Sequence, residues 1–213
     1  MMSLAIAKTA GPGRPKDLEK RAAILQAAKR LFTTQGFDGT SMDAIAQAAG
    51  VSKLTVYSHY QDKERLFVAA VECVCSEQMP PEVFLADLKG PLRKQLITIA
   101  RAFFSLISSE EALAVHRTIV ANAQQSPKLG QLFWEAGPRR VQIAFESFLR
   151  DEVAGGKLDV PDTHRAATQF FCLLKGELFA RREFGCCEAF TQREIDDHVN
   201  ATVDLFLRAY TPR

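Results

Sequence analysis

The sequence predicts an all-α protein with a small N-terminal unit and a larger helical body. Apolar residues recur at helical spacing from one end of the chain to the other, and no stretch shows the two-residue alternation of a strand. Gly and Pro residues separate the periodic segments. The 213 residues suffice for one large or two small domains, and 47% apolar with 24% charged residues is the composition of a compact, soluble protein.

The chain is expected to begin with a flexible basic arm, residues 1–16. The run KTAGPGRPK combines Pro, Gly and cations without apolar periodicity. A first helix follows from about Asp17 to Gln35, because apolar residues line one of its faces. Gly36 is its predicted end, since glycine suits the left-handed position after a helix.

The next stretch predicts two short helices joined by a tight turn. Thr40 and Asp43 have the spacing of a capping box, which predicts a helix that ends near residue 49. Gly50 suits a left-handed turn position, and Ser52 can cap a second helix over residues 53–60. Two helices of about two turns each around a glycine-containing turn are typical of the helix-turn-helix motif.

The second of these helices is predicted to present a polar face. Ile45 and Val56 fit a core made with the first helix of the chain, which leaves one side of the second short helix open. Cationic, aromatic and short polar groups remain on or near that side: Lys53, Thr55, Tyr57, Ser58 and His59. Such groups suit contacts with base edges and phosphates in the major groove of DNA.

Charge is distributed unevenly along the chain. Residues 1–66 hold ten Lys and Arg against six Asp and Glu, a net +4, whereas the whole chain is +2, so the remainder is −2. A basic front end on a slightly acidic body is expected where one end meets a polyanion such as DNA.

The rest of the chain is predicted to be helical throughout. Asp62 can cap a long helix to about residue 78, which Pro80 and Pro81 end and which links the front unit to the body. Further helices are expected at about 91–107, 110–124, 127–136, 138–154, 162–184 and 191–210.

From GRPK through RAAILQAAKRLFTTQGFDGTSMDAIAQAAGVSKLTVYSHYQDKERLF, the sequence resembles the DNA-binding domain of the TetR family of transcriptional regulators. The similarity covers roughly residues 14–78, and the later run EALAVHRTIVANAQQSPKLGQLFWEAGP resembles the AefR-like branch of that family. The resemblance implies a homodimeric repressor that binds a palindromic operator on double-stranded DNA and takes a small inducer. The implied domains are a helix-turn-helix DNA-binding domain over 17–77 and a helical effector-binding and dimerisation domain over 78–213.

The resemblance also implies roles for single residues. Its DNA-facing positions are Thr40, Ser52, Lys53, Thr55, Tyr57, His59 and Lys63. Tyr57 and Lys63 are expected on phosphates and Thr55 nearest the bases. Leu54 stands where many members have a small residue, which leaves the base contacts open.

The C-terminal body holds two further candidate sites. The resemblance implies that the last two helices form the dimer interface. The alternative is that they close the core of the monomer. The interface candidates are Phe170, Leu174, Leu178, Val199 and Phe206. A cavity for a small hydrophobic or amphipathic effector is expected among the central helices. The candidate lining residues are Phe103, Phe104, Ile107, His116, Val120, Phe133 and Trp134. For each of them, ordinary core packing is the alternative.

Catalytic motifs are missing from the sequence. It contains no Walker loop, dinucleotide glycine pattern or HExxH, and its four histidines are scattered, so no catalytic residue, cofactor or metal is expected. Asp196, Asp197 and His198 are interpreted as a solvated helix face. An all-α enzyme or small-molecule carrier is the alternative function, and an activator or architectural protein is the alternative within DNA binding.

Two expectations concern the environment of the chain. The five cysteines are odd in number and lack a CxxC pair, which favours reduced, mostly buried thiols. No apolar run approaches the roughly 20 residues that cross a bilayer, and the first residues lack a basic leader. A cytoplasmic protein without a membrane partner is therefore expected.

Overall fold

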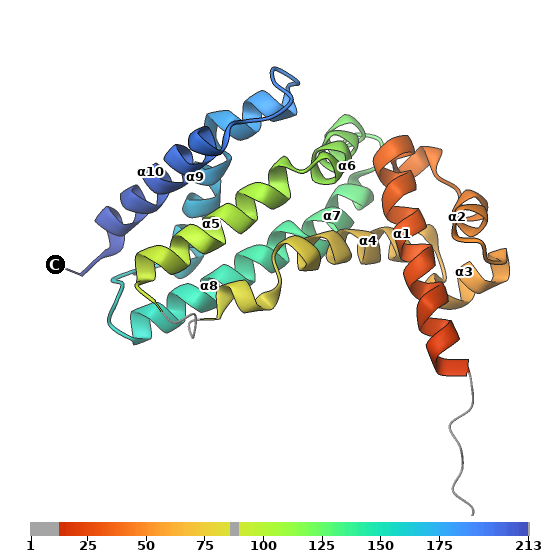
Figure 1. The fold of residues 1–213 in the computed structure, drawn as a ribbon, viewed down its shortest axis with the longest axis horizontal. Coiled ribbons are helices and arrows are strands. Elements are labelled where there is room, and N and C mark those ends of the chain that lie inside the picture. Colours follow the sequence, from red (N-terminus) through yellow and green to blue (C-terminus); the bar gives the residue numbers. More distant parts are fainter. Residues whose placement is uncertain (1–12, 86–89, 213) are drawn as a thin grey trace, which may run out of the picture.

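The computed structural model describes residues 13–85 and 90–212, and these residues form ten α-helices and one short 3-10 helix without a strand (Figure 1). The predicted fold class is confirmed. Most helix bounds lie within three residues of those predicted, because the caps and the glycine and proline stops are read from neighbouring residues. A 3-10 helix, η1 (Pro81–Phe84), was not predicted.

A head of three helices occupies one end of the molecule: α1 (Gly13–Gly39), α2 (Met42–Ala49) and α3 (Lys53–Tyr60) (Figure 1). Ile24 of α1, Ile45 of α2 and Val56 of α3 are fully buried in a common core. Phe32 stacks on Phe37 with ring centroids 5.8 Å apart, and both rings meet Phe67 edge-on. The predicted apolar faces therefore hold the head together.

The start of α1 differs from the prediction. The helix begins at Gly13, so residues 13–16 of the predicted arm are helical, and residues 1–12 lie outside the described residues. Pro15 does not prevent this, because an amide of the first helical turn has no partner within the helix in any case. Gly36 has φ 71° and ψ 178°, which interrupts α1 at its predicted end.

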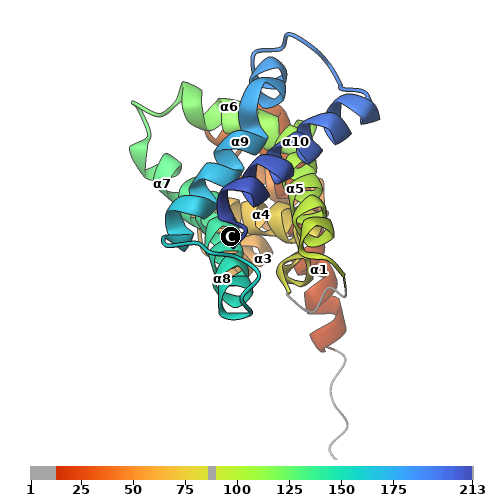
Figure 2. The same ribbon diagram turned by 90° about the vertical axis from the view of Figure 1, so that its left-hand side faces the viewer.

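The body contains α4 (Lys63–Gln78), α5 (Leu92–Ser108), α6 (Glu110–Ala121), α7 (Pro127–Ala136), α8 (Pro138–Ala154), α9 (Thr163–Glu183) and α10 (Gln192–Tyr210). The long α4 runs from the head into the body (Figure 1), and its residues join both hydrophobic cores. Figure 2 shows α9 and α10 crossing in front of α5 and α8, at the end of the molecule away from the head. Helix α5 packs against α4, α6, α9 and α10.

The predicted interface residues lie in the core of the monomer. Phe170, Leu174 and Val199 are fully buried and Phe206 is 2% exposed, while Leu178 is half-buried. These apolar stripes face α5 and α8, because burial within the chain uses the most apolar side of each terminal helix. The prediction that these four residues form a dimer interface was wrong, and the alternative, closure of the monomer core, is what the structure has.

Two properties of the chain bear on its chemistry. All five cysteines are free, and none is fully buried: Cys172 and Cys186 are exposed and the other three are half-buried. The expectation of mostly buried thiols was wrong, because Cys172 is exposed on α9 and Cys186 and Cys187 follow the end of that helix. Among the described residues, no helix is both long and apolar enough to span a bilayer.

Candidate nucleic-acid interface and central cavity

The turn between α2 and α3 is built from local backbone geometry. Gly50 has φ 66° and ψ 31°, a left-handed conformation that L side chains rarely adopt, and its amide reaches the carbonyls of Ala46 and Gln47. The Ser52 hydroxyl accepts the amide of Thr55 at 3.2 Å and so caps α3 as predicted. At α2 the cap is Ser41, whose hydroxyl accepts the amide of Ala44 at 3.1 Å.

Thr40 does not face outward. Its side chain is 1% exposed and donates a hydrogen bond of 2.7 Å to the carbonyl oxygen of Gly36. The predicted capping box with Asp43 is absent, because the interruption of α1 at Gly36 turns the Thr40 hydroxyl back toward that carbonyl. Thr40 therefore fixes the join between α1 and α2, and its assignment as a DNA-facing side chain was wrong.

Lys63 holds the same join from α4. Its ammonium donates to the carbonyl oxygens of Phe37 at 2.9 Å and Thr40 at 3.1 Å, and it lies 4.2 Å from the centroid of the Phe37 ring. A lysine ammonium has three N–H donors, so one remains for an outside acceptor such as a phosphate. Lys63 therefore has a structural role in the head, and its contact with a phosphate stays a prediction.

His59 packs back on the head. Its ring Nε2 lies 3.2 Å from an Asp17 carboxylate oxygen, and the imidazole is 12% exposed. This pair ties α3 to the first turns of α1. His59 acts as a positioning residue for α3, because its ring turns toward α1 and away from the open face.

The open face of α3 is formed by Leu54, Tyr57 and Ser58, with Lys53 beside them. Leu54 is 79% exposed and Tyr57 is 39% exposed, and Lys53 and Ser58 are also exposed. Residues at i, i+3 and i+4 share one side of a helix, so this face is continuous. Thr55 is half-buried, and its hydroxyl is hydrogen-bonded to the Ser52 hydroxyl at 2.8 Å.

Lys53, Tyr57 and Lys63 converge on a shallow hollow between α2, α3 and α4. Asp43 also lines it and accepts a hydrogen bond of 2.9 Å from the Lys53 ammonium, which raises the pKa of Lys53. Two cations and a phenol around one hollow provide the donors that a phosphate oxygen needs. Three carboxylates, those of Asp38, Asp43 and Asp62, also line the hollow, and that of Asp43 competes for the Lys53 ammonium.

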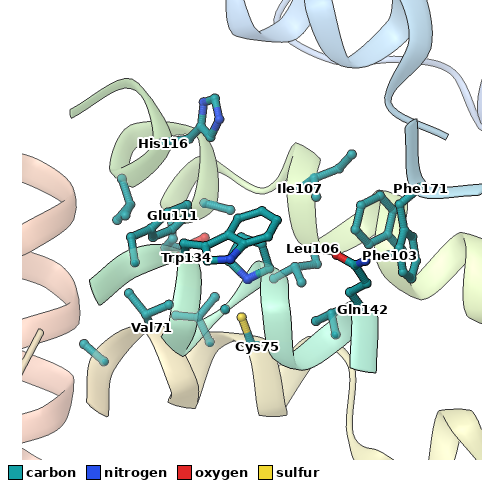
Figure 3. Close-up of a pocket in the computed structure, with 18 of the residues that line it drawn as sticks. Val71, Cys75, Phe103, Leu106, Ile107, Glu111, His116, Trp134, Gln142 and Phe171 are labelled. Atoms are coloured by element: carbon teal, nitrogen blue, oxygen red, sulfur yellow. The ribbon is translucent and has the colours of Figure 1, made fainter. Parts of the chain in front are cut away.

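A cavity of about 320 Å³ lies in the body between α1, α4, α5, α6, α7, α8 and α9 (Figure 3). Its wall includes five of the predicted residues: Phe103, Ile107, His116, Phe133 and Trp134. Trp134 is 49% exposed, and Figure 3 places its indole in the middle of the cavity, above Cys75. The apolar wall with few polar groups is typical of a small-molecule site.

Two predicted residues do not line the cavity. Phe104 is buried on the other side of α5, where its ring lies 5.7 Å from His198, because successive helical residues point about 100° apart. Val120 is 59% exposed on the last turn of α6. Both were chosen from helix patterns that do not determine which neighbour a face meets.

The sequence predicted no cavity residue on α4, α8 or α9, although all three helices contribute to the cavity wall. Val71, Val74 and Cys75 of α4 form one side, and Gln142 and Phe171 reach in from α8 and α9. The Phe171 ring lies 4.3 Å from that of Phe103, and Figure 3 shows the pair side by side with Gln142 directed toward them. The apolar spacing of Val71 and Val74 is visible in the sequence, but the helices that this side of α4 faces are not.

Burial changes the chemistry of one thiol in this wall. Desolvation raises the pKa of Cys75 to about 11, so the group stays a neutral thiol at physiological pH. The side of α4 that faces the cavity is therefore uncharged.

Polar groups occur at the edges of the cavity. His116 Nδ1 lies 2.7 Å from a Glu183 carboxylate oxygen, which connects α6 to α9. Lys175 of α9 lies over the Phe179 ring at 5.6 Å, and its side chain is exposed. A ligand in the cavity would thus meet mostly apolar walls, together with the Lys175 cation, the His116 imidazole and the Glu111 carboxylate.

The predicted solvated face at the start of α10 makes separate contacts. Asp196 pairs with Arg101 at 2.8 Å, Asp197 with Arg193 at 3.6 Å, and His198 lies 2.8 Å from the Leu174 carbonyl oxygen. Their side chains diverge, and no group of three His, Cys, Asp or Glu within the described ranges is placed to hold a metal.

Comparison with known families identifies two matches. Residues 24–70 match the family described as bacterial regulatory proteins, tetR family, and residues 94–212 match the AefR-like transcriptional repressor, C-terminal domain. The second match alone covers more than half of the chain.

Solved structures and curated proteins agree with these families. A putative TetR-family transcriptional regulator from Mesorhizobium loti superimposes with a TM-score of 0.80 at 32% identity, over 92% of this chain and 99% of that one. The Flavonoid-responsive Regulator FrrA gives 0.73 at 34% identity, over 91% and 98%. YhgD of Bacillus subtilis, an HTH-type transcriptional regulator, is 22% identical over 139 residues, 65% of this chain and 70% of its own length.

Proposed function

Because the chain belongs to the TetR family of transcriptional regulators, we propose that it is a homodimeric repressor controlled by a small effector. It is a helix-turn-helix DNA-binding protein of a family of regulators that are not enzymes. In the proposed mechanism, one dimer occupies a palindromic operator that overlaps a promoter and excludes polymerase. Such a protein acts in the cytoplasm, where its DNA lies.

The single observation that carries this proposal is the open face of α3. Its helix is capped by Ser52, held to α1 by His59, and leaves Leu54 and Tyr57 exposed at the end of the molecule. A short rigid helix presented in this way fits the major groove. Lys53, Tyr57 and Lys63 are proposed to bind phosphates around the hollow, while Ser52 and Thr55 approach the bases.

Two copies are needed for tight, specific binding, because one short helix makes too few contacts. We propose that the outer faces of α9 and α10 form the interface with a second copy. The apolar stripes of these helices are buried in the monomer core, but Leu173 of α9 is 39% exposed and Leu205 of α10 is 48% exposed. The two heads would then read half-sites about 34–36 Å apart or a multiple of this distance.

The proposed effector is a flat aromatic molecule with a polar rim. The half-exposed indole of Trp134 and the adjacent, mutually tilted rings of Phe103 and Phe171 lie within one cavity. Lys175 and His116 at the edge suit a phenol or carboxylate. The name of FrrA, which is 34% identical over most of both chains, describes it as flavonoid-responsive, and this supports the same class here.

Release from DNA is proposed to proceed through α4. This helix carries Val71, Val74 and Cys75 in the cavity wall and begins with Lys63 beneath the α1–α2 join. A ligand that prefers a shifted α4 would move the two heads out of register with the half-sites. The change in occupancy is limited by the difference in the ligand's affinity for the two conformations.

Selection of duplexes from a random DNA pool tests the DNA-binding proposal. We expect a palindromic consensus, bound with log K falling against log salt by about 0.9 for each neutralised phosphate. Recovery of unrelated sequences, or binding that ignores salt, would contradict it.

The effector class has its own test, because Trp134 is the single tryptophan of the chain. Addition of a flavanone should quench its fluorescence and release the selected operator. A long-chain fatty acid serves as the comparison ligand. If the fatty acid quenches and releases while the flavanone does neither, the aromatic assignment is wrong.

A further inference from the structure

Leu54 is the most exposed of the large apolar side chains in the described part of the chain, at 79%. It contributes nothing to the core of the head, which uses Val56 and Tyr60 from the same helix. A single exposed leucine is ordinary on a protein surface. Its position is what matters, because it is the second residue of α3.

The first residues of a helix that enters the major groove are those that approach base edges. Within the first three residues of α3, the Lys53 ammonium is bonded to Asp43 and the Thr55 hydroxyl to Ser52. Leu54 points outward between them. Beside the proposed approach of Ser52 and Thr55, Leu54 is therefore the apolar group of α3 that a base edge would meet.

The chemistry of leucine restricts what it can face. Its side chain has no donor or acceptor, so it leaves an amino group or carbonyl of a base without a partner and removes water from it. The major-groove edge of thymine differs from the other three because it carries a methyl group at C5. Burial of a methyl group against an aliphatic side chain is favourable without any hydrogen bond.

We propose that Leu54 selects a thymine in each operator half-site by packing on its C5 methyl group. This inference rests on the proposed function, since it presupposes that α3 binds in the major groove. Tyr57 and Ser58, one turn further along the same face, limit where that thymine can lie. The methyl contact is worth about fourfold in affinity for one half-site, from the transfer of one buried methyl group. Replacement in both half-sites should lower affinity about fifteenfold, because the two contacts are independent.

The test uses the full chain and the operator recovered by selection. Each thymine of the operator is replaced in turn by deoxyuridine, which lacks the methyl group and keeps every hydrogen-bonding group. Dissociation constants are measured for the wild type, for Leu54→Ala and for Ile143→Ala. Ile143, 50% exposed on α8, provides a matched loss of an exposed aliphatic side chain away from the head.

We expect one position in each half-site where deoxyuridine weakens binding by the wild type and by Ile143→Ala. At that position Leu54→Ala should bind the thymine and deoxyuridine operators equally. Uniform affinity of the wild type across all replacements, or an undiminished preference in Leu54→Ala, would overturn the inference while leaving the proposed function intact. If selection recovers no specific duplex, the proposed function fails and the inference fails with it.

Discussion

Replacement of Lys63 by Met tests the double role of this side chain. The change keeps the aliphatic length and removes the ammonium that bonds the carbonyls of Phe37 and Thr40 and lies on the Phe37 ring. Hydrogen bonds from a charged group contribute about 1.5–3 kcal/mol each, and the ring contact about 0.5–1 kcal/mol. The contributions of one ammonium are not additive, and water can reach the half-buried carbonyls, so we expect a loss of about 2–4 kcal/mol of unfolding free energy.

The assay is urea denaturation followed by circular dichroism, with Arg65→Met as the control. Arg65 lies two residues away, is 61% exposed and pairs with Asp62 at 3.6 Å, so its loss should lower stability by less than about 1 kcal/mol. Salt titration of operator binding then tests the second role of Lys63, the contact with a phosphate. If the third N–H meets a phosphate, Lys63→Met lowers the slope of log K against log salt by about 0.9 for each protomer.

Equal stability of Lys63→Met and Arg65→Met would refute the structural role. A salt slope unchanged from that of the wild type would refute the phosphate contact. The two results are independent, since denaturation is measured without DNA.

Gly50→Asn should keep operator binding, because asparagine tolerates a left-handed backbone. Gly50→Val should lower the free energy of unfolding by about 1–3 kcal/mol. No neighbour lies within 4 Å of the added Cβ, so the whole cost is backbone strain at φ 66°. Indistinguishable melting temperatures of Gly50→Asn and Gly50→Val would contradict this. Asp43→Asn should tighten binding to non-specific duplex at low salt, because it releases the Lys53 ammonium and removes a negative charge beside the DNA; weaker or unchanged binding in a fluorescence-polarisation titration would count against it. At pH 8 the Cys75 thiolate should be about a hundredfold scarcer than that of an ordinary thiol, because its pKa is about 11 instead of 9.0, so iodoacetamide should modify Cys75 slowly. Its raised pKa also predicts that stability falls between pH 9 and 11, where the thiol ionises in the unfolded chain first; alkylation of Cys75 as fast as that of unfolded protein would refute both.

Contacts between α6 and α1 provide a second connection between cavity and head. The Thr118 side chain lies 3.3 Å from the position of a Cβ at Gly36, where α1 is interrupted. Glu111, Val115 and His116 on the same helix line the cavity. A glycine is needed at this approach because its φ of 71° is left-handed and the space is occupied.

The sequence alone determined the helices of this protein and the motif at its front end. The Ser52 cap, the Gly50 turn and the breaks at Pro80 and Gly137 depend on residues within about one helical turn of each other. Apolar periodicity identified the buried side of each helix for the same reason. The fold class and the helix-turn-helix motif were therefore predictable without tertiary information.

Tertiary structure decided which neighbour each helix face meets. Thr40 turns inward because α1 breaks at Gly36, and His59 packs on Asp17 because α3 crosses the start of α1. Phe104 and Phe103 are adjacent in sequence, yet one packs toward α10 and the other lines the cavity. Phe170 and Phe206 meet in the monomer core, although the family resemblance favoured a dimer interface for both. The physical reason is that helical period fixes the direction of a side chain around its own axis, whereas the partner on that side is set by crossings between segments distant in sequence.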